Sequence, residues 1–153
     1  ARGFLHEQIG IDVIKTEQKA ECSSYFTLKP YTALMSISGS FSMNIAFSFD
    51  TTLIEQVYRV YCHDLEIEDD ERLEHIDETA ADMINIVIGN STEQLAADGT
   101  VVKISVPIVI NEADSLSIRD VQFLTTTLFT HTGDMMVTAM PNTMDYGTKG
   151  GKL

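Results

Sequence analysis

The clearest hydrophobic pattern in the chain lies between Tyr31 and Phe49. Met43, Ile45, Phe47 and Phe49 fall at every second position with polar or small residues between them. A period of two is typical of a strand that buries one face. The turn residues Ser38-Gly39-Ser40 come before this strand, after a first apolar stretch. We therefore predict a β-hairpin over residues 31–49.

Three segments show the spacing of helices. Asp50-Thr51-Thr52 offers an N-cap for a helix that we expect to end near Cys62-His63. Gly10 offers a C-terminal residue for an N-terminal helix, part of which we expect to lie upstream of the given residues. A longer helix is predicted over residues 69–98, before Gly99. Its core side would consist of the apolar positions Leu73, Ile76, Ala80, Met83, Ile84, Val87 and Ile88.

The remaining apolar runs favour strands. Weak alternation predicts a short strand over residues 11–15, and a continuous run predicts one over residues 101–110. Two more are predicted near residues 120–130 and 134–140, joined by a turn at His131-Thr132-Gly133-Asp134. This order indicates an α+β domain with a largely antiparallel sheet and helices packed on one side. We predict one domain over residues 1–141, followed by a flexible tail over residues 142–153.

Composition narrows the class of protein. The chain has 153 residues and a formal net charge of −13, with two cysteines, Cys22 and Cys62. This acidity argues against a nucleic-acid partner, because phosphate contacts need clustered lysine and arginine. No apolar run reaches the roughly 20 residues that span a bilayer, so we expect no membrane association. Two widely separated cysteines favour reduced thiols and a cytoplasmic location.

The charge is concentrated in one stretch. Residues 64–82 contain ten acidic residues and one arginine, which gives −9 of the total −13. The simplest interpretation is a solvated helix face with the loop before it.

The polar face of the long predicted helix carries an unusual set of residues. Asp82 and Asn85 are three residues apart, so they lie about 60° apart around the helix axis and about 4.5 Å along it. Gly89 follows one turn later, where glycine costs roughly 1 kcal/mol relative to alanine. Ile86 is a large apolar residue at the edge of this face. Each of these residues also has an explanation without a function. Asp82 and Asn85 could simply face water, and Gly89 could permit a helix crossing. Ile86 could pack under a loop or against a second subunit.

The segment from Asp82 to Asn90 resembles a signature of the CheX/CheC family of chemotaxis phosphatases. In that family the signature reads Glu-x-x-Asn followed by x-x-x-Gly-Asn in a long helix. The hairpin with its glycine turn, the helix start at Asp50-Thr51-Thr52 and the strand Val106-Pro107-Ile108-Val109 also resemble family features. The likeness extends from Phe4 to Met140. It implies a CheC-like fold.

The resemblance also implies a function. The expected activity is dephosphorylation of a phosphorylated CheY-like receiver domain, with Asp82 engaging a lysine of the partner and Asn85 orienting the attacking water. Glu78, Ile86 and Gly89 would belong to the partner-binding surface. The chain would need no cofactor or metal of its own, because Mg²⁺ would belong to the site of the receiver. A homodimer is expected as well.

One departure from the family keeps other functions open. The acid of the signature is Asp82 here, which is one methylene shorter than the usual glutamate. The alternative is therefore a non-catalytic interaction or dimerisation module of the same fold. A small-ligand-binding domain is a third hypothesis. His75 shares a face with Glu71, Glu78 and Asp82, but a carboxylate-rich face with one histidine is weak support for a metal site.

Overall fold

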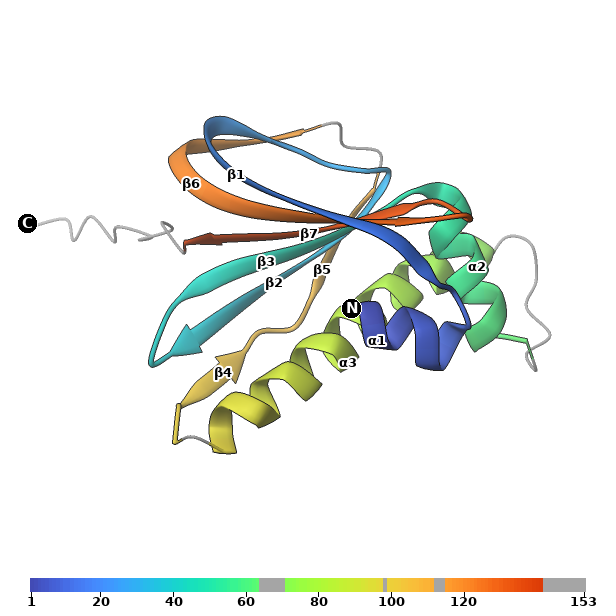
Figure 1. Ribbon diagram of the computed structural model, residues 1–153, viewed down its shortest axis with the longest axis horizontal. Helices are drawn as coiled ribbons and strands as arrows, with labels where there is room; N and C mark the ends of the chain where they lie inside the picture. Colours follow the sequence, from blue (N-terminus) through green and yellow to red (C-terminus); the bar gives the residue numbers. More distant parts are fainter. Residues whose placement is uncertain (64–70, 98, 112–114, 142–153) are drawn as a thin grey trace, which may run out of the picture.

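The residues that the structure describes form a seven-stranded antiparallel sheet with helices on one of its faces (Figure 1). The computed structural model describes residues 1–63, 71–97, 99–111 and 115–141. In chain order the elements are α1 (Arg2–Phe4), the π-helix η1 (Leu5–Ile9), β1 (Val13–Thr27), β2 (Tyr31–Gly39), β3 (Met43–Phe49), α2 (Thr51–Tyr61), α3 (Arg72–Ala97), β4 (Val102–Ile104), β5 (Ile108–Asn111), β6 (Ser115–Thr130) and β7 (Asp134–Pro141).

The strands follow the order β1-β6-β7-β3-β2-β4, and β5 also pairs with β2. Every pairing is antiparallel. Strand β1 therefore forms one edge of the sheet, while β4 and β5 follow each other along the opposite edge. In Figure 1, β1 and β6 curve together away from the other strands as a two-stranded arch.

The main hydrophobic core lies between the sheet and the helices. Met35, Phe47 and Phe49 project from β2 and β3 into it, where they meet buried residues of α1, η1, α2 and α3. The alternate positions of the same strands point to the other face. There a smaller cluster forms beneath the arch, made of Leu28, Ala46, Val121, Phe123 and Met140. The predicted α+β class, with an antiparallel sheet and helices on one side, is thus confirmed.

The hairpin and the helix ends agree with the sequence pattern. Strands β2 and β3 pair from Tyr31 opposite Phe49 to Ile37 opposite Met43. Helix α2 ends at Tyr61 with Cys62 as its C-cap, and Gly10 caps η1 in the left-handed conformation with φ 75°. Asp50 precedes α2 but makes no side-chain cap to it. Its carboxylate instead accepts bonds from Lys29 Nζ and the Asp134 backbone N–H, each 2.7 Å long.

Two predicted strands differ from the structure. Strand β1 runs to Thr27, well past the predicted end at residue 15, because an edge strand exposed on both faces needs no apolar alternation. The predicted strand 101–110 is two short strands, β4 and β5, with Pro107 between them. Proline lacks the N–H that a ladder requires. Both short strands pair with β2.

The long predicted helix corresponds to α3, which begins at Arg72. Residues 64–70 and 98, with most of the acidic loop, and the predicted tail 142–153 lie outside the described residues. Leu73 was expected in the core, and this was wrong: its side chain is 65% exposed. It precedes the first residue of α3 that packs on the sheet, Ile76. Among the described helices, none is long and apolar enough to cross a membrane.

Candidate functional site on helix α3

Helix α3 is fixed to the sheet by its apolar side. Ile76, Ala80, Met83 and Ile84 are at most 1% exposed, and Val87 and Ile88 are also buried. Asp77 adds a polar anchor, since both of its carboxylate oxygens accept bonds of 2.7 Å from the Asn111 side chain in β5. This packing holds the backbone of α3 in place and determines which side chains face solvent.

The structure brings Asp82 and Asn85 together on that solvent face, where both side chains are exposed. Within the described residues, neither forms a hydrogen bond or an ion pair. The carboxylate and the amide are therefore free to contact another molecule. The rigid backbone beneath them makes their mutual position fixed before any contact, which lowers the entropic cost of using them together.

The other predicted residues lie around this pair. Ile86 is 37% exposed and belongs to neither core cluster. Gly89 is partly exposed, and a Cβ atom built on it would have no neighbour within 4 Å. A close helix crossing among the described residues therefore does not explain the glycine. A cleft of 480 Å³ opens beside Ile86, between the N-terminal helical turns and α3.

Glu78 lies one turn before Asp82 and is exposed, but it is not isolated. Its Oε2 atom lies 2.9 Å from Nδ1 of His75. The two residues form an i,i+3 pair that is charged only when the histidine is protonated. Such an exposed pair is worth little to stability, about 0.3–0.5 kcal/mol at most. Glu78 therefore stays available to a partner that can displace His75.

The C-terminal end of α2 flanks the same face, which the sequence did not predict. Burial raises the pKa of Tyr61 above its usual value of 10.0, and the negative charge of Asp82 raises it further. Burial also raises the pKa of the Cys62 thiol, and the charge of Glu78 adds to this effect. Tyr61 stacks on Phe4 with ring centroids 6.1 Å apart. The charge of Asp82 thus favours the neutral form of this phenol.

The first half of α3 is acidic where it faces solvent. Glu71, Glu74, Glu78 and Asp82 are exposed, whereas the nearby cation Arg72 is engaged by Glu55 at 3.1 Å. A row of exposed carboxylates on one helix attracts positively charged groups over about a Debye length. Among the described residues, no group of three or more histidine, cysteine and acidic side chains is arranged to hold a metal ion.

An open antiparallel sheet with helices on one face is the fold of CheX and CheC-like chemotaxis proteins. The sequence profile described as chemotaxis phosphatase CheX matches residues 31–128, which include the strands β2 and β3 and all of α3. The chain belongs to the CheX family.

Solved structures show the same fold. The chemotaxis protein CheX from Desulfovibrio desulfuricans superposes with a TM-score of 0.75 at 18% identity, over 90% of this chain and 91% of that one. A putative chemotaxis protein from Desulfovibrio vulgaris Hildenborough gives 0.70 at 20% identity, over 90% and 88%. A chain in the CheX–CheY–BeF3–Mg²⁺ complex from Borrelia burgdorferi gives 0.59 at 20% identity, over 90% of each chain. No curated protein sequence matches this chain.

Proposed function

We propose that the protein accelerates the dephosphorylation of a CheY-like receiver domain, using Asp82 and Asn85. The observation that carries the proposal is their joint exposure on the rigid face of α3, without a partner in the described part of the chain. Membership of the CheX family supports it. The Borrelia burgdorferi complex of CheX with CheY supports the choice of partner.

In the proposed reaction a water molecule attacks the phosphorus atom of the aspartyl phosphate in line with the leaving carboxylate. The phosphorus–oxygen bond to the aspartate breaks, which releases a free carboxylate and inorganic phosphate. The amide of Asn85 suits the orientation of this water, because it donates and accepts hydrogen bonds without changing charge. Asp82 would pair with a lysine of the receiver and hold the two proteins in register. Mg²⁺ would be bound by the receiver, so this chain would need no cofactor.

Phosphate release tests the proposal directly. A receiver domain from the same genome is phosphorylated with a small phosphodonor, the donor is removed, and release is followed with and without the protein. We expect the decay rate to rise with the concentration of the protein until it saturates. Glu93→Gln, an exposed change further along α3, serves as the control and should retain the acceleration. No acceleration with any receiver of that genome would contradict the proposal.

The shorter acid favours one alternative, a non-catalytic module of the same fold that binds receivers or a second copy. The variant Asp82→Glu separates the two functions. If the natural chain is competent, lengthening the side chain should change the rate by less than about tenfold, equivalent to about 1.4 kcal/mol. A wild type without activity that gains a large acceleration on this change would show that the natural site is impaired. The phosphate-release assay measures both outcomes.

Glu78, Ile86 and Gly89 would form the docking surface around the reacting pair. Gly89→Ala tests this surface and has opposite expected effects on folding and binding. Because a Cβ atom at this position meets nothing, alanine should stabilise α3 by about 0.5–1 kcal/mol. Affinity for the receiver should fall about tenfold if a partner backbone approaches there. Urea unfolding and a binding titration provide the two values, and undiminished binding would remove Gly89 from the surface.

We further propose a cytoplasmic location, where receiver domains are found, and a homodimer. The acidic exposed face of α3 supports a protein partner that presents a lysine. The homodimer requires a surface outside this face, since α3 must stay accessible to the receiver.

A further inference from the structure

The arch formed by β1 and β6 encloses a cleft on the face of the sheet opposite the helices. The two strands run together and then bend back over this face (Figure 1). Their register shifts between Ser23 and Tyr25, as at a β-bulge, which bends a strand and increases its twist. A cleft of 520 Å³ lies beneath the bend, within the range of about 300–1,000 Å³ that is typical of small-molecule sites.

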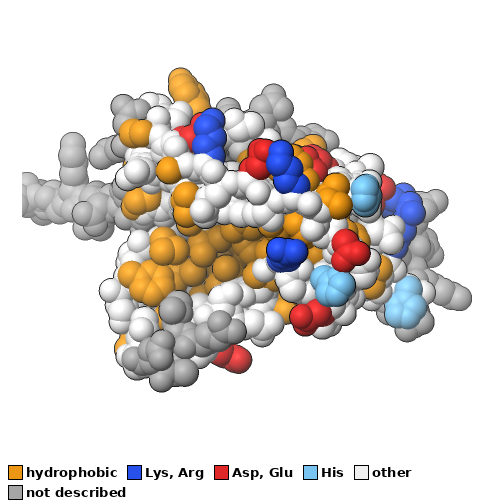
Figure 2. Space-filling model, in the orientation of Figure 1, with side chains coloured by type: hydrophobic (Ala, Val, Ile, Leu, Met, Phe, Trp, Pro, Cys, Tyr) orange, Lys and Arg blue, Asp and Glu red, His pale blue; other side chains and the backbone are white. Residues whose placement is uncertain are grey.

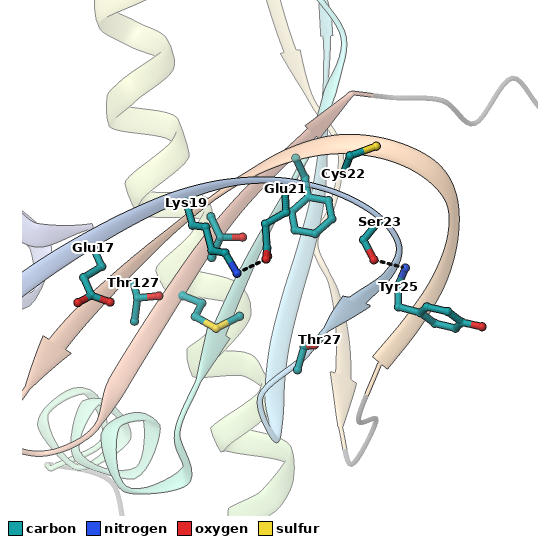
Figure 3. Close-up of a pocket in the computed structure, with 11 residues that line it drawn as sticks. Glu17, Lys19, Glu21, Cys22, Ser23, Tyr25, Thr27 and Thr127 are labelled. Atoms are coloured by element: carbon teal, nitrogen blue, oxygen red, sulfur yellow. Dashed lines mark hydrogen bonds and ion pairs between the residues drawn. The ribbon is translucent and has the colours of Figure 1, made fainter.

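Charged side chains of β1 form one wall of the cleft. Glu17, Lys19 and Glu21 occupy every second position, so they share one face of the strand, and all three border the cleft. Figure 3 shows these side chains with the ion pair between Lys19 and Glu21. In Figure 2, basic and acidic side chains lie next to one another along the upper part of the molecule. The wall therefore presents one ammonium group between two carboxylates.

Strands β6 and β7 supply the floor of the cleft. Three floor residues follow the charged wall in register, with Glu17 opposite Thr127, Lys19 opposite Thr125 and Glu21 opposite Phe123. Phe123 belongs to the smaller apolar cluster, and Met136 of β7 adds a second apolar side chain to the lining. The Thr127 hydroxyl forms no side-chain hydrogen bond within the described residues. The floor thus offers an apolar surface next to a hydroxyl group that can bind a ligand.

The charges of the wall determine which ligand fits. The side chains of Lys19 and Glu21 are 73% and 37% exposed, and an ion pair in contact with water contributes little to stability. A ligand can therefore separate this pair at small cost. A zwitterion would give Lys19 a carboxylate and Glu21 an ammonium group, so both residues would keep a partner of opposite charge. A ligand with a single charge would leave one of them without a partner in a partly enclosed site, which lowers its affinity.

We propose that the cleft beneath the arch binds a small zwitterion with an apolar side chain, the chemistry of an apolar amino acid. The ligand carboxylate would contact Lys19 and the hydroxyl of Thr127, and the ligand ammonium would contact Glu21. Its apolar side chain would lie on Phe123 and Met136. The site is independent of the proposed phosphatase activity, because α3 packs on the opposite face of the sheet. Failure of either proposal leaves the other standing.

Three probes of nearly the same shape test the charge requirement with the intact chain. L-phenylalanine carries both charges, 2-phenylethylamine carries only the ammonium group, and 3-phenylpropanoate carries only the carboxylate. We expect L-phenylalanine to bind with a dissociation constant of about 1 mM or lower, and the other two probes to bind at least about tenfold more weakly. Amide chemical shifts, followed by NMR during each titration, give the affinities. The largest changes should fall on residues 17–21 and 123–127 and not on α3.

Two charge-neutralising variants identify the contact of each ligand group. Lys19→Gln should remove the advantage of the ligand carboxylate, so that L-phenylalanine and 2-phenylethylamine bind equally. Glu21→Gln should remove the advantage of the ammonium group, so that L-phenylalanine and 3-phenylpropanoate bind equally. Lys103→Gln, the matched control on an exposed residue of β4, should keep the wild-type order of the three probes.

Three results would overturn the proposed site. The first is equal binding of the three probes by the wild type, and the second is a loss of L-phenylalanine binding in Lys103→Gln as large as in Lys19→Gln. The third is the absence of shift changes at residues 17–21 and 123–127 with L-phenylalanine, L-leucine and L-methionine, each at about 10 mM, ten times the expected dissociation constant.

Discussion

Replacing Asn85 with alanine should reduce the acceleration of receiver dephosphorylation by at least about 100-fold, the usual loss when one positioned transition-state donor is removed. Folding should not suffer, because the Asn85 side chain is exposed and alanine favours helix by about 0.5 kcal/mol over asparagine. The phosphate-release assay gives the first value and urea unfolding gives the second. The dissociation constant for the receiver should change less than about threefold, since orienting a water contributes little to docking.

The variant Asn85→Asp tests whether activity depends on the amide group itself or only on the shape of the side chain. Aspartate has nearly the same volume but lacks the donor and adds a negative charge beside the attacking water. It should therefore be as inactive as the alanine variant. Glu93→Ala, which removes an exposed side chain further along α3, should keep the wild-type rate. Equal acceleration by wild type and Asn85→Ala would refute the water-orienting role and leave only binding to explain the exposed pair.

The candidate site could be predicted from the sequence because it depends on helical geometry. Once apolar positions place Ile76, Met83 and Ile84 toward the core, the step of about 100° fixes Asp82 and Asn85 on the opposite side. The structure confirms both exposures. The proximity of Tyr61 to Asp82 could not be predicted, since it arises from the packing of α2 against α3. Tyr61 ends an ordinary apolar helical pattern, and nothing in that pattern indicates which residue of α3 it borders.

The fold was predictable where burial imposes a period and unpredictable where it does not. The hairpin of β2 and β3 buries one face, so the alternation ending at Phe49 located it. Strand β1 is exposed on both faces over most of its length, and its residues 15–24 are mostly charged, polar or small. The edge pairing with β6 forms it, and this is a contact between residues far apart in the chain, such as Gln18 and Thr126. No local pattern contains such information.

The exposure of Leu73 has a similar cause. Helical spacing places it in line with Ile76 and Ala80, but it lies at the rim of the sheet, beside Tyr31 at the start of β2 and Asn111 at the end of β5. The same limit explains why the run 101–110 was predicted as one strand. Its apolar residues continue through Pro107, while the ladder with β2 stops at Ile104 and resumes at Ile108. Periodicity predicts which side of a helix or strand is buried. It does not predict where the neighbouring part of the sheet that covers this side ends.

Gly39→Ala should produce the largest loss of stability among single substitutions to alanine in the turn regions described. Gly39 ends β2 with φ 125°, a conformation that strains any residue with a side chain. A Cβ atom there would lie 2.2 Å from the backbone oxygen of Val101. Backbone strain and overpacking together should lower the free energy of unfolding by roughly 2–5 kcal/mol.

The obstructing carbonyl has little freedom to move aside. Val101 O accepts a hydrogen bond of 2.9 Å from the Ser40 backbone N–H, and Val101 N–H donates to Ser40 Oγ at 3.1 Å. Gly39 itself pairs with Val102 at the end of the β2–β4 ladder. Relieving the clash would therefore break the contacts that dock β4 on the sheet. Because β4 follows α3 closely in the chain, the C-terminal turns of α3 should also exchange their amide hydrogens faster in this variant.

Gly10→Ala is the matched control for this substitution. Gly10 also has a positive φ, 75°, but a Cβ atom on it would meet nothing within 4 Å. Its expected cost is therefore the conformational term alone, about 1–2 kcal/mol. Urea unfolding of the two variants isolates the steric term as their difference. If Gly39→Ala costs no more than Gly10→Ala, the carbonyl of Val101 can yield, and the junction of β2 with β4 is more pliable than its hydrogen bonds indicate.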